Sequence, residues 1–249
     1  MTTLLSSAPR PLMNATTSAS PRRLDLLTNY SNPRSLGFRF RARRIGPLVR
    51  LIEHTFQHHG EVKILDVGGR KTYWDILPKD FLRENRARVT LLNLPCDLQG
   101  QDDSIFTHAT GNACDMSEFG DDYFHIVHSN SVIEHVGGWP QMKQFAQEVR
   151  RVAPHLYVQT PYYWFPVEPH YLTPFFHWLP KPFQVRLLRS FTLGNRGRAA
   201  NLDDALMKLE DAPRMLDLKS FKLLFPDCRI LKERFLLLTK SLIAVRGPA

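Results

Sequence analysis

Residues 62–69 read Val-Lys-Ile-Leu-Asp-Val-Gly-Gly. An apolar run leads up to an acid, Asp66, and a glycine pair, Gly68 and Gly69, closes the stretch. This pattern predicts a buried parallel strand that ends in a tight turn before a helix. In doubly wound α/β sheets a ligand binds just outside such a strand end. The stretch therefore predicts both a fold class and the position of a site.

Strand and helix patterns alternate along the rest of the chain. Further apolar runs that predict strands lie at 88–94, 105–110, 124–129, 156–160, 229–237 and 241–245. Helices are predicted at 74–85, from Pro140 onward with an amphipathic pattern, and at 216–225. Strands that alternate with helices form a mainly parallel sheet, and the two closing strands, which have no helix between them, predict one antiparallel strand.

The N-terminal part differs in composition from the rest of the chain. Residues 1–35 are rich in Ser, Thr, Pro and Ala, and we expect a mostly disordered lead-in there. Residues 36–249 are expected to form a single domain. Its first helix is predicted from the apolar period between Ile45 and Phe56, with Gly60 at its end.

The charge is concentrated in this N-terminal part. The chain carries +9 overall, but residues 1–60 hold nine arginines and two acids, and the remaining residues are nearly neutral. The region with the motifs is thus not basic, so a nucleic-acid partner is not expected. We interpret the arginines around Arg39, Arg41, Arg43 and Arg44 as a solvated helix face.

Composition also bounds the cellular setting. No run approaches the ~20 apolar residues of a membrane-spanning helix, so no membrane span is expected. The three cysteines, Cys96, Cys114 and Cys228, are scattered and show no metal-ligand spacing. They indicate a reducing compartment, and we expect a cytoplasmic protein without a bound metal.

Four segments, in this order, resemble the class I S-adenosylmethionine-dependent methyltransferases. They are Ile-Leu-Asp-Val-Gly-Gly at 64–69, Gly-Asn-Ala-Cys-Asp at 111–115, Tyr-Phe-His-Ile-Val-His-Ser-Asn-Ser-Val-Ile-Glu-His-Val at 123–136, and Lys-Ser-Leu-Ile-Ala-Val at 240–245. The resemblance covers about residues 60–246. It implies a three-layer, seven-stranded Rossmann-like α/β sheet with an antiparallel last strand, and S-adenosyl-L-methionine as cofactor.

The resemblance also implies a set of cofactor-binding residues: Asp66, Gly68, Gly69, Asn93, Asn112, Ala113 and Ser129. The chain departs from the family pattern at several of them. Arg70 and Thr72 stand where the first motif commonly has glycines, and Asn93 and Asn112 stand where it has acids. S-adenosylmethionine has no phosphate, so this loop can carry side chains, and both amides can hydrogen-bond a neutral ribose or adenine.

The acceptor side is predicted from a segment that follows the fifth strand. Residues 161–182 hold many prolines and eight aromatic residues: Tyr162, Tyr163, Trp164, Phe165, Tyr171, Phe175, Phe176 and Trp178. We expect this segment to line the acceptor pocket, with the insertion at 162–213 covering the acceptor. A packed apolar loop is the alternative.

Three side chains are candidates for acid–base work. Glu168 and His170 lie two positions apart within the aromatic segment, and His135 follows Glu134 after the fourth strand. A histidine, whose unperturbed pKa is near ~6.5, can accept a proton at neutral pH. His170 is the preferred catalytic base, followed by Glu168 and His135.

The predicted function is biosynthetic methyl transfer from S-adenosyl-L-methionine to a small-molecule or saccharide-type acceptor, at oxygen rather than nitrogen. Two alternatives stay open. One is an RNA methyltransferase that uses the basic N-terminal segment, and the other is a non-catalytic binding protein with the same fold. The sequence does not specify the acceptor or the oligomeric state.

Overall fold

The computed structural model describes residues 35–78, 80–95, 100–168, 170–194 and 196–248. The lead-in predicted at 1–35 therefore lies outside the described residues, except for Ser35. The Oγ of Ser35 accepts a hydrogen bond from the Phe38 N–H (3.0 Å) and caps helix α2 (Leu36–Arg44). Helix α3 (Gly46–His59) follows, and the left-handed Gly60 ends it as predicted.

Seven strands form one sheet in the order β3-β2-β1-β4-β5-β7-β6. Their bounds are β1 (Val62–Val67), β2 (Ala87–Asn93), β3 (Phe106–Thr110), β4 (Ile126–Asn130), β5 (His155–Pro161), β6 (Arg229–Phe235) and β7 (Leu238–Arg246). Strands β1 to β5 are parallel, whereas β7 runs antiparallel to both of its neighbours. The predicted fold class is confirmed, including the closing hairpin. Successive strands are added on one side of β1 up to β3 and on its other side from β4 onward. Open α/β sheets bind ligands at such a reversal of the strand order, here between β1 and β4.

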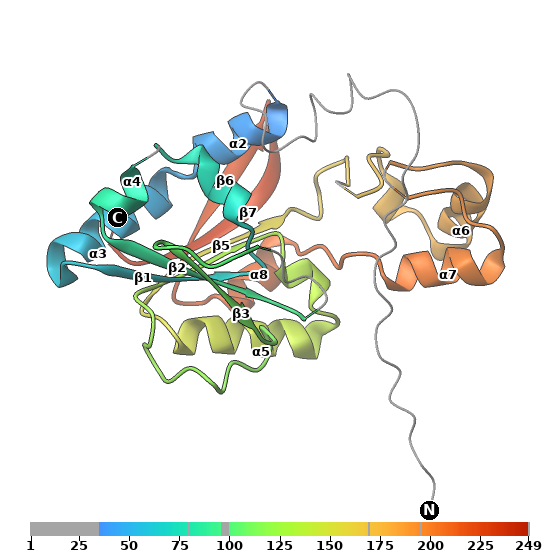
Figure 1. Cartoon of the computed structure of the whole chain (residues 1–249). Coiled ribbons are helices and arrows are strands. Elements are labelled where there is room, and N and C mark those ends of the chain that lie inside the picture. Colours follow the sequence, from blue (N-terminus) through green and yellow to red (C-terminus); the bar gives the residue numbers. More distant parts are fainter. Residues whose placement is uncertain (1–34, 79, 96–99, 169, 195, 249) are drawn as a thin grey trace, which may run out of the picture.

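Helices cover both faces of the sheet (Figure 1). One face packs against α5 (Trp139–Arg151) and α8 (Leu218–Leu224), and the other packs against α2, α3, the 3₁₀ helix η1 (Lys71–Ile76) and α4 (Phe81–Glu84). Successive residues of β1 alternate between the two cores, so Leu65 faces α5 whereas Ile64 faces α3. Asp66 shares the face of Ile64 and points toward η1.

Two helix predictions need correction. The helix predicted at 74–85 is split into η1 and α4, because Pro78 holds the preceding Leu77 in an extended conformation (ψ 157°). The proline-rich residues 162–183 were also expected to form no regular element, but α6 (Lys181–Ser190) begins within them and tolerates Pro182 in its first turn.

The insertion after β5 stands beside the sheet (Figure 1). It contains η3 (Phe176–Trp178), α6 and α7 (Leu202–Glu210). It has an apolar cluster of its own, formed by Tyr171, Phe176, Leu188, Leu193, Ala199 and Ala205. None of the described helices is both long and apolar enough to span a bilayer.

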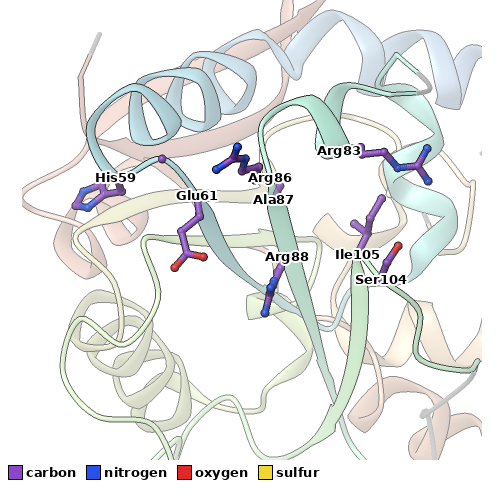
Figure 2. Close-up of a pocket in the computed structure, with 9 residues that line it drawn as sticks. His59, Glu61, Arg83, Arg86, Ala87, Arg88, Ser104 and Ile105 are labelled. Carbon is purple, nitrogen blue, oxygen red and sulfur yellow. The ribbon is translucent and has the colours of Figure 1, made fainter.

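A cavity of about 650 Å³ lies at the amino edge of the sheet. It is bordered by His59 and Glu61 before β1, by Arg86 and Arg88 at the start of β2, and by Ser104 before β3 (Figure 2). None of the predicted site residues borders it. Ligands of such sheets bind at the opposite, carboxyl edge, so we do not place the predicted site in this cavity.

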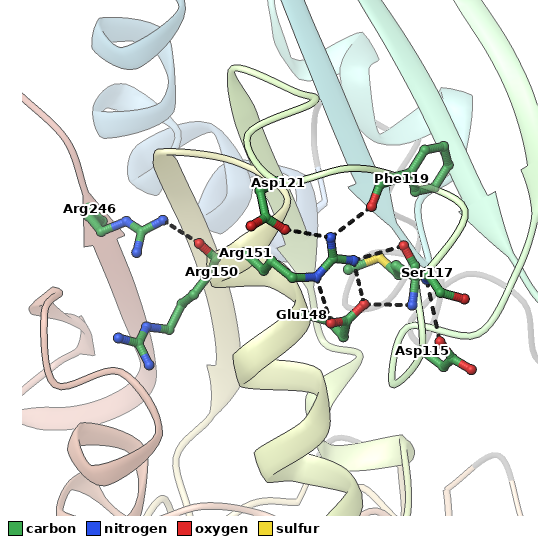
Figure 3. Close-up of polar contacts among 9 residues, drawn as sticks. Asp115, Ser117, Phe119, Asp121, Glu148, Arg150, Arg151 and Arg246 are labelled. Atoms are coloured by element: carbon green, nitrogen blue, oxygen red, sulfur yellow. Dashed lines mark hydrogen bonds and ion pairs between the residues drawn. The ribbon is translucent and has the colours of Figure 1, made fainter.

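The loop that carries Asn112 and Ala113 is tied to the last turn of α5 by one arginine (Figure 3). Arg151 donates to the carbonyl oxygens of Met116 (2.9 Å) and Phe119 (2.7 Å). It also pairs with Glu148 (2.8 Å) and Asp121 (3.0 Å). The Met116 N–H donates to Glu148 (2.7 Å), so the loop is held through both its donors and its acceptors.

We predict that Arg151→Ala destabilises the fold more than Arg150→Ala does. The two side chains are similarly exposed, at 29% and 32%, but in the described residues the guanidinium of Arg150 pairs only with Asp227. Loss of charged donors to buried carbonyls should lower the free energy of unfolding by about 1–3 kcal/mol, and loss of one surface pair by about 0–1 kcal/mol. Urea denaturation of both variants measures this, and equal losses would contradict it.

Candidate functional site

The turn after β1 can be built only from glycines. Gly68 has a φ of +66°, and a Cβ at this position would lie 2.5 Å from Val132 Cγ2. A Cβ at Gly69 would overlap the carboxylate of Asp66. The Gly68 N–H donates to the Leu92 carbonyl (2.8 Å), which fixes the turn against the end of β2. The backbone therefore carries no side chain at the position where a ligand at this edge would contact it.

Asp66 lies beneath this turn and is fully buried. Its Oδ2 accepts a hydrogen bond from Trp74 Nε1 (2.8 Å), and its Oδ1 pairs with His128 Nδ1 (2.6 Å). The His128 ring packs against Tyr73 and is stacked on Tyr157. The structure thus shows Asp66 supporting the turn from inside the sheet. Its direct contact with a cofactor stays a prediction, because the side chain is enclosed in the described structure.

The other predicted cofactor residues lie along the same edge. Asn93, at the end of β2, donates from Nδ2 to the Gly69 carbonyl (2.9 Å). Its backbone carbonyl accepts from the Gly111 N–H (3.0 Å), which brings the loop with Asn112 and Ala113 next to it. Asn112 is exposed and accepts from the Cys114 N–H (3.0 Å). The structure therefore connects these loops through backbone groups.

Ser129 lies at the end of β4 beside the same turn. It is fully buried, and its Oγ donates to the Val67 carbonyl (3.4 Å). Little of this side chain is available to a ligand. Of the predicted cofactor residues, Gly68 and Asn112 are exposed, and Gly69, Asn93 and Ala113 are partly exposed.

The three predicted acid–base residues form a cluster. Glu168 and His170 are joined by a 2.5 Å contact between Oε1 and Nδ1, and the His135 ring lies edge-on to the His170 ring at 4.9 Å. Glu168 Oε2 also accepts from the N–H groups of His170 (2.9 Å) and Tyr171 (2.7 Å). These contacts combine residues that follow β4 with residues that follow β5.

The contacts set the protonation of the cluster. Burial raises the pKa of Glu168, but the hydrogen bonds from His170 and Tyr171 outweigh it, and the net pKa is lowered. An ionised Glu168 accepts the Nδ1 proton of His170, which leaves Nε2 as the basic nitrogen. Partial desolvation, with His170 and Arg196 nearby, lowers the pKa of His135 and favours its neutral form.

Glu134 adds a second buried carboxyl to this cluster. It is 1% exposed, its Oε2 accepts from Thr160 Oγ1 (3.0 Å), and its Oε1 has no hydrogen-bond partner among the described residues. Burial raises the pKa of Glu134 to about 7. From the sequence, Glu134 and His135 were expected either to line the acceptor pocket or to pack under the following helix. The raised pKa of Glu134 was not predicted, because its burial depends on the packing around Thr160.

The predicted solvated arginine face is wrong for Arg44. Arg39 and Arg43 are exposed, but the Arg44 side chain is only 9% exposed. Its Nη1 pairs with Glu233 (2.8 Å), and its Nη2 donates to Asn130 Oδ1 (2.6 Å) at the end of β4. Glu233 is 189 positions away along the chain, so no local pattern signals this pair.

We predict that Glu134 makes the stability of the protein depend on pH. The folded pKa of about 7 lies above the ordinary 4.5, so the folded state holds the proton more tightly. The contribution of Glu134 to the free energy of unfolding is therefore fully present below about pH 4.5 and is lost as the pH rises through about 7. Glu134→Gln should remove this part of the pH dependence in denaturation series at pH 5 and pH 8, whereas the exposed Glu61→Gln should retain it. An unchanged pH dependence in Glu134→Gln would contradict the prediction.

Comparisons with known proteins give the fold. No family model and no curated protein matches the sequence. The structure is similar to the carbon methyltransferase DszA, with a TM-score of 0.53 and 13% identity over 88% of this chain and 56% of that one. It is also similar to phosphoethanolamine N-methyltransferase 2 of Haemonchus contortus in complex with S-adenosyl-L-methionine (TM-score 0.44, 13% identity, 74% and 38%). The chain thus spans little more than half, or less, of the length of these proteins. Together with the strand order, the likeness to DszA shows that the chain has the Rossmann-like fold of the class I methyltransferases.

Proposed function

We propose that this protein transfers a methyl group from S-adenosyl-L-methionine to a hydroxyl of a small-molecule or saccharide-type acceptor. The observation that carries the proposal is the pairing of a bare glycine turn after β1 with a Glu168–His170 dyad after β5, both at the carboxyl edge of one sheet. The first suits a donor without phosphates, and the second suits removal of a proton from a hydroxyl.

The residues at the donor half fit this cofactor. The side-chain oxygen of Asn93 has no hydrogen-bond partner in the described part of the chain and is not enclosed. It would accept from a ribose hydroxyl, Gly68 would leave room for the donor, and Asn112 would face the adenine side. When bound, S-adenosyl-L-methionine supplies an activated methyl group on a sulfonium centre.

At the acceptor half the chain would hold and move one proton. His170 Nε2 would take the proton of the acceptor hydroxyl as the oxygen attacks the methyl carbon. The ionised Glu168, bonded to Nδ1, would stabilise the imidazolium that forms. The aromatic segment at 161–182 and the insertion at 162–213 would enclose the acceptor and exclude water.

We predict that S-adenosylhomocysteine binds the purified protein. A ligand that binds the native state stabilises it, by about 2.7 kcal/mol at a concentration 100 times its Kd. Gly68→Ala should weaken binding at least tenfold, because the new Cβ meets Val132 and the φ of +66° becomes strained. Calorimetry and thermal shift measure both effects.

Gly120→Ala is the matched control for this experiment. A Cβ at Gly120 meets no atom within 4 Å, so its affinity should equal that of the wild type. Absence of both heat and thermal shift for the wild type at millimolar ligand would refute the proposed cofactor. Binding without turnover on any acceptor pool would instead favour a non-catalytic protein.

We predict that His170→Ala lowers kcat by about 10²–10⁴, the usual contribution of a general base. The affinity for S-adenosylhomocysteine should stay within about twofold, because the donor half is formed by residues at the ends of β1, β2, β3 and β4. His177→Ala is the control, since His177 contacts the Tyr163 carbonyl in the same segment (2.8 Å) but lies outside the dyad. Near-normal turnover of His170→Ala would overturn the assignment.

A further inference from the structure

Two cationic side chains, Arg44 of α2 and Lys240 of β7, lie together under α2 at the carboxyl edge of the sheet. We call them the α2 cation pair. Glu233 of β6 is the carboxylate near both. Its Oε2 accepts from Arg44 Nη1 (2.8 Å) and from Ser241 Oγ (2.5 Å), whereas its buried Oε1 has no hydrogen-bond partner in the described part of the chain. The Lys240 ammonium has no carboxylate within 4.0 Å among the described residues. It lies 3.7 Å from the centroid of the Phe40 ring.

Among the described residues, Arg44 and Lys240 share one carboxylate, that of Glu233, and Lys240 is partly shielded from water. Burial lowers the pKa of Lys240 to about 8; Glu233 opposes this shift, and Arg44 adds to it. The buried Nε of Arg44 also has no hydrogen-bond partner in the described part of the chain. Removing a cation from water is costly unless an anion or a hydrogen-bond acceptor meets it. An anion bound beside the α2 cation pair would therefore offset the cost of removing these cations from water.

The pair borders both halves of the proposed site. Arg44 bonds to Asn130, the residue after Ser129 at the end of β4. The Lys240 carbonyl accepts from the Tyr162 N–H (3.0 Å), at the start of the aromatic segment. Phe235 of β6 connects α2 to the aromatic segment. Its ring centroid lies 5.5 Å from that of Phe40 in α2 and 6.4 Å from that of Phe165 in the segment.

We propose that Arg44 and Lys240 form a binding site for an anionic group of a substrate, a carboxylate or a phosphate. Lys240 supplies an ammonium with three donors, and Arg44 supplies the free N–H of its guanidinium. The position of the site rests on the proposed function, but the binding of an anion does not require a methyl donor.

Direct binding measurements test the proposal. The probes are inorganic phosphate and benzoate, with benzyl alcohol as an uncharged counterpart, all at constant ionic strength. In the wild type both anions should raise the melting temperature and benzyl alcohol should not. Lys240→Met keeps the length of the side chain and should weaken both anions at least tenfold, whereas Lys240→Arg should retain them. Lys232→Met, an exposed lysine of the same hairpin, should behave like the wild type.

Two further ligands identify the source of the anion. If Lys240→Met weakens S-adenosylhomocysteine at least tenfold but leaves its decarboxylated analogue unchanged, the anion is the carboxylate of the donor. If S-adenosylhomocysteine is unaffected and benzoate or phosphate is lost, the anion belongs to the acceptor. The proposal would be overturned if wild type and Lys240→Met bound all anionic ligands equally. It would also be overturned if the wild type bound neither phosphate nor benzoate and Lys240→Met bound S-adenosylhomocysteine as well as the wild type does. A response to anions without any binding of S-adenosylhomocysteine would refute the methyltransferase and leave the anion site standing.

Discussion

The carboxylate of Asp66 occupies the centre of the sheet, and the carboxyl edge is built around it. A buried carboxylate is tolerated only when its oxygens are paired, and Trp74 and His128 provide those partners from η1 and β4. The same carboxylate fills the space under Gly69, so the turn must be bare at that position. One buried side chain thus connects β1 to β4 and holds η1 against the sheet. The shape of the turn above it follows from these contacts.

The edge above Asp66 separates into two electrostatic halves. After β4 and β5, two carboxyls and two imidazoles lie together, and one of the carboxyls, Glu134, has its pKa raised to about 7 by burial. Under α2, among the described residues, the cations Arg44 and Lys240 lie near one acid, Glu233. The edge thus holds titratable carboxyls and imidazoles on one side and the side chains of Arg44 and Lys240 on the other. An acceptor with a hydroxyl and an acid at opposite ends would be oriented by this difference.

The fold was predictable because its signals are local. The predicted strands agree with the observed ones to within three residues at every end, since apolar runs and turn residues act over a few positions. Glu168 and His170 were predicted as neighbours for the same reason. The contact of His135 with His170 depends on how the loops after two adjacent strands fold over the sheet. The inward position of Arg44 depends on Glu233, 189 residues away. Nothing in the sequence marks His128 and Trp74 as partners of Asp66. These contacts become visible only once β1 and β4 are paired and η1 packs on the sheet.

The insertion after β5 has an apolar cluster separate from the two cores of the sheet. A substitution in the cluster of the insertion should leave the packing of the two sheet cores nearly intact, because distant sites affect stability almost independently. Residues such as Leu188 and Ala205 can therefore vary in size without disturbing the glycine turn or the strands beneath it. The shape of the insertion can thus be altered without altering the sheet on which the glycine turn stands.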